Sequence, residues 1–82
     1  MEPQEIYTRL TPIFREVLDD DELVPTPELT ARDLPDWDSL RHIRLIVTVE
    51  RELGVKFTTA EIAALENVGQ FVALIGAKLG RG

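Results

Sequence analysis

The chain has 82 residues, 44% of them hydrophobic, and a formal net charge of −6. This length has room for one small core, so we expect a single domain over residues 1–82. The negative charge disfavours nucleic-acid binding, and no apolar run is long enough to cross a membrane. The acidic start lacks the pattern of a signal peptide, and no membrane partner is expected. A reducing cytoplasm is the natural compartment for a chain without cysteine. The absence of cysteine excludes disulfides and thiolate metal sites.

Residues 3–18 predict an amphipathic helix with Pro3 in its first turn. The apolar residues recur at three- and four-residue spacing and form one stripe: Ile6, Leu10, Ile13, Phe14, Val17 and Leu18. Pro12 lies inside this pattern, where a proline costs about 3 kcal/mol. Either the helix kinks at Pro12 or it restarts at Thr11, and one kinked helix is favoured.

Residues 19–38 predict a long loop, because they contain three prolines and no sustained periodicity. Structureless loops of this length are unusual in compact domains and tend to be functional. The acidic run at 19–22 does not fit a calcium-binding loop, since Val24 and Thr30 stand where that loop needs glycine and glutamate. No metal site is therefore expected. Four apolar residues are expected to anchor the loop to the core: Leu23, Leu29, Leu34 and Trp37.

A second helix is expected over residues 39–53, with Asp38 as its N-cap and Gly54 at its C-terminal end. The apolar face predicted for this helix consists of Ile43, Ile46, Val47, Val49 and Leu53. Residues 55–57 then predict a short extended segment.

Two further helices are expected, over residues 59–65 and 68–79. Thr58 and Glu61 form a capping-box pattern before the first of them, and Asn67 is a suitable N-cap for the second. Residues 80–82 are expected to fray. Periodicity places six residues in the core: Ile43, Ile46, Leu53, Ile62, Phe71 and Ile75. The sequence thus predicts an all-α fold, a four-helix bundle with a long loop between the first two helices and a short third helix.

Ser39 is the residue with the most chemical interest. A serine that directly follows an aspartate cap presents its hydroxyl beside unsatisfied backbone N–H groups and the positive end of the helix dipole. A phosphodiester formed there is electrostatically favoured. Asp-Ser before a helix is common, however, and most often serves only as a cap, so this feature alone is a weak signal.

The surrounding sequence makes the signal stronger. Asp38-Ser39-Leu40 is similar to the Asp-Ser-Leu signature of acyl and peptidyl carrier proteins, and the stretch ELGVKFTTAEIAALENVGQFVALI at 52–75 resembles the rest of such a domain. The resemblance covers essentially the whole chain. It implies an acyl carrier protein, not an enzyme, in which Ser39 bears a covalent 4′-phosphopantetheine arm. The thiol of that arm holds an acyl group as a thioester.

The resemblance also implies partners. They are a phosphopantetheinyl transferase, an acyl-loading enzyme, and a ketosynthase or other acyl-accepting enzyme, all visited by a monomeric carrier. Asp38 is expected to cap the helix and help present Ser39. Four residues are expected to contact partner enzymes: Leu40, Arg41, Arg44 and Val47.

Two departures from the family pattern bear on the expected partners and pathway. Asp36 stands where the family commonly has glycine, and it is followed by the bulky Trp37. The helix after Ser39 begins basic, whereas many family members are acidic there. The basic start of this helix favours a dedicated set of partner enzymes. The sequence around Ser39 resembles that of stand-alone carriers of polyketide or related secondary metabolism, including antibiotic biosynthesis.

Three alternatives are weaker. A peptidyl or aminoacyl carrier shares the same motif. Acyl cargo is preferred only on the general similarity of the sequence to acyl carriers. A small helical protein–protein interaction module would need no prosthetic group and would tolerate loss of the Ser39 hydroxyl. A hydrolase built on Ser39 and His42 lacks a third orienting group and an oxyanion hole.

Overall fold

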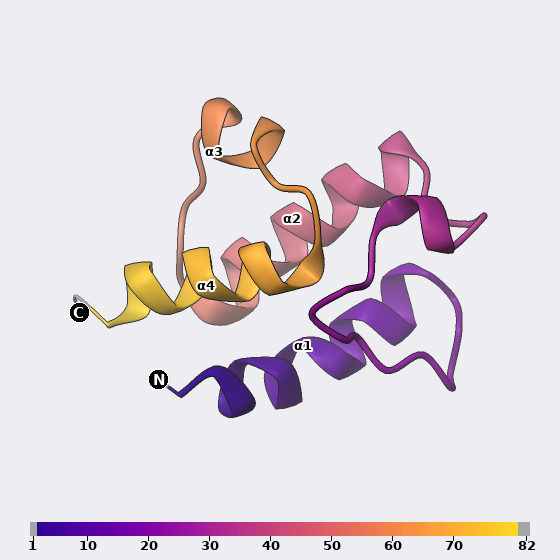
Figure 1. The fold of residues 1–82 in the computed structure, drawn as a ribbon, viewed down its shortest axis with the longest axis horizontal. Helices are drawn as coiled ribbons and strands as arrows, with labels where there is room; N and C mark the ends of the chain where they lie inside the picture. Colours follow the sequence, from indigo (N-terminus) through magenta and orange to yellow (C-terminus); the bar gives the residue numbers. More distant parts are fainter. Residues whose placement is uncertain (1, 81–82) are drawn as a thin grey trace.

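The computed structural model describes residues 2–80, and Figure 1 shows that the regular elements in this range are helices joined by loops. They are α1 (Pro3–Val17), the 3-10 helix η1 (Ala31–Asp33), α2 (Ser39–Leu53), α3 (Thr59–Ala63) and α4 (Val68–Leu79). α1 packs against both α2 and α4. The short α3 lies on the connection between α2 and α4. The predicted all-α fold is confirmed. Arg81 and Gly82, part of the end expected to fray, lie outside the described residues.

α1 is one continuous helix that includes Pro12, so the alternative of a restart at Thr11 is wrong. Pro12 is exposed. The carbonyl group that loses its helical N–H partner at a proline can therefore be solvated by water. On the other face of α1, Ile6, Leu10 and Phe14 are completely buried. Burial of this stripe stabilises the helix in spite of the proline.

The buried core is drawn from all three long helices and from the segments that join them. Its members are Ile6, Leu10, Ile13, Phe14, Val17, Leu18, Leu23, Leu45, Ile46, Val49, Leu53, Val55, Val68, Phe71, Val72 and Ile75. Among the described residues no polar or charged side chain is fully buried. The fold is therefore held mainly by aliphatic and aromatic packing.

The core prediction for α2 was wrong at Ile43, whose side chain is 61% exposed. Leu45, which the sequence analysis left out, is 1% exposed and takes the core position instead. With 3.6 residues per turn, Leu45 and Val49 share the inward face while Ile43 lies on the opposite side. Ile62 was also expected in the core, but it is only partly buried and packs against the core from α3. α3 ends at Ala63 instead of residue 65.

The long loop before α2 is tied to the rest of the molecule at several points. Leu23 is buried, and the other three expected anchors are partly buried against the core. The carbonyl groups of Pro27 and Leu29 accept hydrogen bonds from the N–H groups of Gly69 and Val68, at 3.0 and 2.9 Å. The loop is not structureless, since it contains η1. The loop therefore forms one wall of the molecule beside the start of α4.

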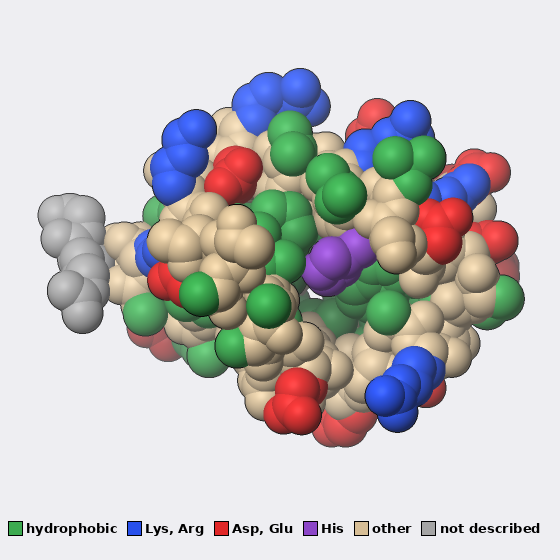
Figure 2. Space-filling model, turned by 90° about the horizontal axis from the view of Figure 1, so that it is seen from above, with side chains coloured by type: hydrophobic (Ala, Val, Ile, Leu, Met, Phe, Trp, Pro, Cys, Tyr) green, Lys and Arg blue, Asp and Glu red, His purple; other side chains and the backbone are tan. Residues whose placement is uncertain are grey.

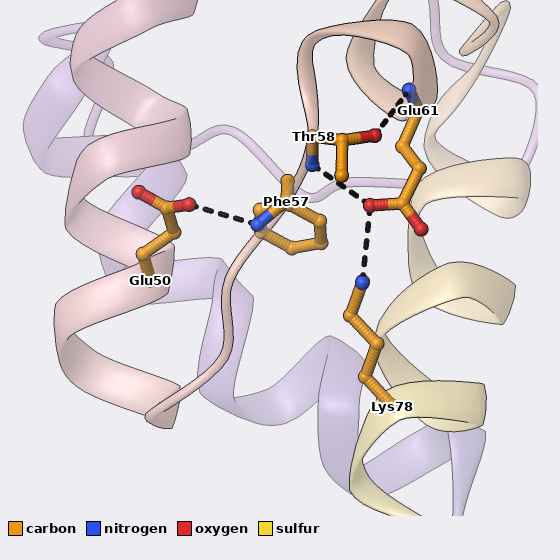
Figure 3. Close-up of polar contacts among 5 residues, drawn as sticks. All are labelled: Glu50, Phe57, Thr58, Glu61 and Lys78. Atoms are coloured by element: carbon orange, nitrogen blue, oxygen red, sulfur yellow. Dashed lines mark hydrogen bonds and ion pairs between the residues drawn. The ribbon is translucent and has the colours of Figure 1, made fainter.

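The segment between α2 and α3 is also fixed by polar contacts (Figure 3). Glu50 Oε2 accepts from the Phe57 N–H at 2.9 Å, and the Thr58–Glu61 capping box is formed. Lys78 Nζ of α4 lies 3.0 Å from Glu61 Oε1. The Thr58 backbone N–H, followed by Lys78, lowers the pKa of the Glu61 carboxyl group below its usual value. These contacts join α3 to both α2 and α4, although α3 has no fully buried residue of its own.

Gly54 ends α2 in the left-handed region, at φ 68°. Gly54→Ala is expected to lower the free energy of unfolding by about 1 kcal/mol, because an L side chain is disfavoured at this backbone conformation. No atom lies within 4 Å of the Cβ that alanine would add, so the penalty is conformational and not steric. Urea denaturation monitored by circular dichroism measures the change.

The matched control is Gly76→Ala in the interior of α4, where the added Cβ would make an ordinary contact with Ile6 Cδ1 at 3.5 Å. Alanine is a better helix former than glycine, so this variant is expected to be about as stable as the wild type or up to about 1 kcal/mol more stable. Equal destabilisation by both substitutions would contradict the conformational explanation.

Candidate functional site

Ser39 is the first residue of α2, and its side chain is exposed. Asp38 is the N-cap, in an extended conformation, and its Oδ1 accepts a hydrogen bond from the Arg41 N–H at 2.9 Å. The cap is therefore provided by the aspartate and not by the serine. Among the described residues the Ser39 hydroxyl has no hydrogen-bond partner. It is free to react with a molecule that approaches from solvent.

The surroundings of Ser39 fit a phosphodiester. The first N–H groups of a helix point outward, and the helix dipole places partial positive charge at this end. Arg41 follows within the first turn of α2 and Arg44 on the next turn, whereas the Asp38 carboxylate directly precedes the serine. Ser39 is also the only serine in the chain. No group of acidic or histidine side chains suitable for a metal ion is found within residues 2–80.

Trp37 and His42 form a pair beside Ser39 that the sequence analysis did not recognise. Trp37 Nε1 donates to His42 Nδ1 at 3.2 Å, and the Trp37 ring packs edge-on against Phe14 at a centroid distance of 5.6 Å. Burial lowers the pKa of the His42 imidazole below its usual value. Trp37, which was predicted as a loop anchor, therefore also donates a hydrogen bond to His42. The two residues are five positions apart and lie on either side of a helix cap, a spacing that corresponds to no regular repeat.

The residues expected to contact partners lie on the first half of α2, but they are not equivalent. Leu40 and Val47 are 67% and 52% exposed, and the structure places Ile43 with them on one face. These three form an apolar stripe at positions i, i+3 and i+7. The spacing of Ile43 from Leu40 and Val47 could have revealed this surface. Ile43 is the exposed residue that the site prediction missed.

The two expected arginines differ in the same way. Arg44 is exposed at the edge of the apolar stripe. Arg41 is partly buried, and one of its guanidinium N–H groups donates to the carbonyl oxygen of Val17 at 3.4 Å. A groove of about 730 Å³ between α1 and α2 reaches Arg44 and Val47 but not Ser39. The apolar stripe and Arg44 are therefore the most accessible part of this surface.

A family model described as "Phosphopantetheine attachment site" matches residues 8–75. The chain is 35% identical over 77 residues to an acyl carrier protein of Thermotoga maritima, with 94% of this chain and 95% of the relative covered. It is 38% identical over 72 residues to a meromycolate extension acyl carrier protein of Mycolicibacterium aurum, covering 88% of this chain and 74% of the relative.

The structural comparison agrees. The solution structure of a holo acyl carrier protein from Geobacter metallireducens superposes with a TM-score of 0.87 at 46% identity, covering 93% of this chain and 87% of that one. Within residues 2–80, no helix has the length and apolar character needed to cross a membrane. The chain therefore belongs to the acyl carrier protein family, whose members are carriers, not enzymes, and hold acyl groups on a covalently attached 4′-phosphopantetheine.

Proposed function

We propose that Ser39 is the attachment point of the 4′-phosphopantetheine arm. The observation that supports it best is a free, exposed hydroxyl at the N-terminus of α2 whose capping role is already filled by Asp38. In the attachment reaction, Ser39 Oγ forms the new bond to the phosphorus of coenzyme A, the adenosine bisphosphate leaves, and the hydroxyl proton passes to the transferase. The arm supplies a thiol that holds the acyl group as a thioester.

Two sets of side chains serve this function in different ways. Asp38 fixes the helix end that presents Ser39, because its carboxylate accepts the hydrogen bond from the Arg41 N–H. Leu40, Arg41, Arg44 and Val47, together with Ile43, form the surface on which we place partner enzymes. The partners are a phosphopantetheinyl transferase, an acyl-loading enzyme, and a ketosynthase or other acceptor. Apolar side chains exposed together beside basic ones fit a partner with an apolar patch bordered by carboxylates.

The biosynthetic pathway in which the carrier acts is a more specific proposal. A polyketide or related secondary pathway, including antibiotic biosynthesis, stays a prediction from the basic start of α2 and the dedicated partner set that this implies. Two relatives are named meromycolate extension acyl carrier protein. Acyl cargo is therefore proposed ahead of aminoacyl cargo.

The experiment for the attachment site is intact-protein mass spectrometry. The purified chain is incubated with coenzyme A, Mg²⁺ and a broad-specificity phosphopantetheinyl transferase, and the modified peptide is then sequenced by fragmentation. One phosphopantetheinyl mass increase on the peptide containing Ser39 is expected. A folded, initially unmodified protein that gains no mass would favour the interaction module without a prosthetic group.

The docking surface gives a separate prediction. Arg44→Glu is expected to lower the kcat/KM for acyl transfer from the loaded carrier to its acceptor enzyme about tenfold at low salt, because a charge at the rim of an interface mainly affects association. The effect is expected to shrink as NaCl is added, since salt screens exposed charges. Lys56→Glu, an exposed change of the same charge between α2 and α3, is the control. Equal losses in both variants would show that net charge, not the α2 surface, is responsible.

A further inference from the structure

The side chains of Trp37 and His42 meet across the segment that carries Ser39. Trp37 Nε1 donates a hydrogen bond to His42 Nδ1 at 3.2 Å, and the two ring centroids are 6.0 Å apart. Trp37 lies at the end of the long loop, and His42 is in the first turns of α2. The bond therefore ties the end of the loop to the helix that follows it, with Ser39 between the two partners.

This pair connects the start of α2 to the core. Within the first turn, Asp38 Oδ1 accepts from the Arg41 N–H and the Asp38 carbonyl oxygen accepts from the His42 N–H, both at 2.9 Å. Those two bonds stay inside the cap and the turn. The Trp37 ring reaches further, because it packs edge-on against the completely buried Phe14 of α1 at a centroid distance of 5.6 Å. Helix ends open with free energies near zero unless such contacts hold them, so the pair bears on how fully the turn is formed.

The hydrogen bond requires a neutral histidine. An indole N–H can only donate, so His42 Nδ1 must accept and carries no proton. A protonated imidazole has an N–H on both ring nitrogens and cannot accept. Figure 2 shows the single histidine of the chain inside a hollow whose rim carries hydrophobic side chains. Burial in these surroundings lowers the pKa of the His42 imidazole below its usual value, so the ring is neutral at pH 7.

The charged groups around the His42 ring are already engaged or lie to the side. Among the described residues that line the hollow, Glu66 in the α3–α4 connection is the other titratable one, and its carboxylate is hydrogen-bonded within that connection. Arg32 of η1 borders a neighbouring hollow with Glu66. On the α2 side, the Asp38 carboxylate accepts from the backbone of Arg41, whose guanidinium group is directed to the end of α1. Burial, more than any one neighbouring charge, therefore controls the protonation of His42.

We propose that Trp37 and His42 are a positioning pair for Ser39: their hydrogen bond keeps the first turn of α2 formed, so that the transferase meets the serine on an ordered helix end, and protonation of His42 releases the turn. Neither side chain takes part in the chemistry of attachment. The proposal rests on the proposed attachment of the arm to Ser39, and it adds two residues outside the Asp38–Ser39–Leu40 motif.

The direction of the pH dependence follows from the His42 pKa. In the unfolded chain the imidazole has its usual pKa of about 6.5, and in the folded chain the pKa is lower. The unfolded state therefore binds more protons once the pH falls below about 6.5. The stability that the neutral ring contributes is complete above that value and is lost as the pH falls through the folded pKa. The hydrogen bond to Trp37 opens over the same fall in pH.

Three variants separate the hydrogen bond from packing. Trp37→Phe keeps an aromatic ring beside Phe14 but has no donor, and His42→Leu keeps a side chain at the edge of the hollow but has no acceptor. His42→Asn has its oxygen as many bonds from Cα as Nδ1 is, so it can accept from Trp37 at every pH. Asparagine and histidine also have similar helix propensities. Circular dichroism checks that each variant is folded.

Attachment kinetics are measured at about pH 7.5, above the usual histidine pKa. The chain is the varied substrate of a phosphopantetheinyl transferase with coenzyme A and Mg²⁺, and intact mass measures the product. His42→Leu and Trp37→Phe are each expected to raise the KM for the carrier about two- to tenfold with kcat unchanged, the range for one neutral hydrogen bond, because fewer molecules present an ordered turn. The double variant is expected to show no further increase. His42→Asn is expected to restore the KM toward the wild-type value.

The pH profile is a readout that packing alone would not change. As the pH is lowered through the His42 pKa, which the ¹⁵N resonances of the ring give directly, the wild-type KM is expected to rise to that of His42→Leu. His42→Asn is expected to show no such rise, and comparison on one enzyme removes the pH dependence of the transferase itself. In the wild type, the single indole N–H resonance is expected to move over the same pH range. The hydrogen-exchange protection of the Arg41 and His42 N–H groups is expected to fall with it.

The outcomes separate the positioning pair from the attachment itself. A folded protein that gains no mass would contradict the attachment at Ser39, and the indole resonance and the exchange protection then decide on the pair without the transferase. Equal KM values in the wild type, His42→Leu and Trp37→Phe would overturn the positioning role. If either of these variants does not fold, the same pH profile in the wild type and His42→Asn would overturn it. An indole resonance that does not follow the His42 titration would show that the hydrogen bond is not formed.

Discussion

Ser39→Ala is expected to abolish the phosphopantetheinyl mass increase completely while changing the free energy of unfolding by no more than about 0.5 kcal/mol. The hydroxyl is the acceptor in the attachment reaction, so its removal leaves nothing to modify. The side chain is exposed and Asp38 provides the cap, so the helix keeps its N-terminal hydrogen bond. Mass spectrometry measures the first effect and urea denaturation the second.

Thr59→Ala is the matched control for this experiment. Thr59 is also exposed and is also the first residue of a helix, directly after the Thr58 N-cap of α3. Modification of this variant is expected to equal that of the wild type. Residual modification of Ser39→Ala would place the arm on another hydroxyl, and unfolding of Ser39→Ala would show that the serine has a structural role.

Phe14→Ala is expected to have the largest effect on stability, a loss of about 3–5 kcal/mol in the free energy of unfolding. Phe14 is completely buried at the centre of the core and supports the Trp37 ring edge-on. Its removal leaves a cavity and deletes one side of the loop anchor. Since small domains have total stabilities of about 5–15 kcal/mol, a large part of the molecules is expected to be unfolded at 37 °C. Thermal and urea denaturation give the change directly.

Phe14→Leu serves as the graded control, because it keeps most of the buried volume and is expected to cost less than half as much. The emission of Trp37 gives a local readout in the same samples: it should shift toward that of solvated tryptophan in Phe14→Ala more than in Phe14→Leu. Equal stabilities for the two variants would show that the site collapses around the smaller side chain and that the cavity argument is wrong.

Local signals in the sequence were sufficient for both ends of α2, for the start of α4 and for the candidate attachment residue. Asp38, Gly54 and Asn67 act within one helical turn, so their capping roles follow from residue type and position alone. The Asp38–Ser39–Leu40 motif is likewise contiguous. All of these features are confirmed as geometry, while the attachment at Ser39 stays a prediction until it is measured.

The orientation of α2 could not be predicted in the same way. The helix has aliphatic residues on two faces, one with Leu45 and Val49 and another with Leu40, Ile43 and Val47. Periodicity shows that each stripe exists but does not show which one packs on α1. That choice depends on tertiary packing. The Trp37–His42 bond was missed for a related reason, since it joins a loop residue to a helix residue whose position becomes known only when the loop is docked.

The hydrogen bonds between the long loop and α4 close one helix start of this molecule to anions. The N–H groups of Val68 and Gly69 donate to loop carbonyls, and those of Gln70 and Phe71 donate to Asn67. The start of α4 is therefore saturated. At the start of α2, by contrast, the N–H groups of Ser39 and Leu40 have no acceptor among residues 2–80. The fold thus closes the start of α4 with its own loop and leaves two N–H groups open at the start of α2, so that an anion can bind beside the serine and not at the start of α4.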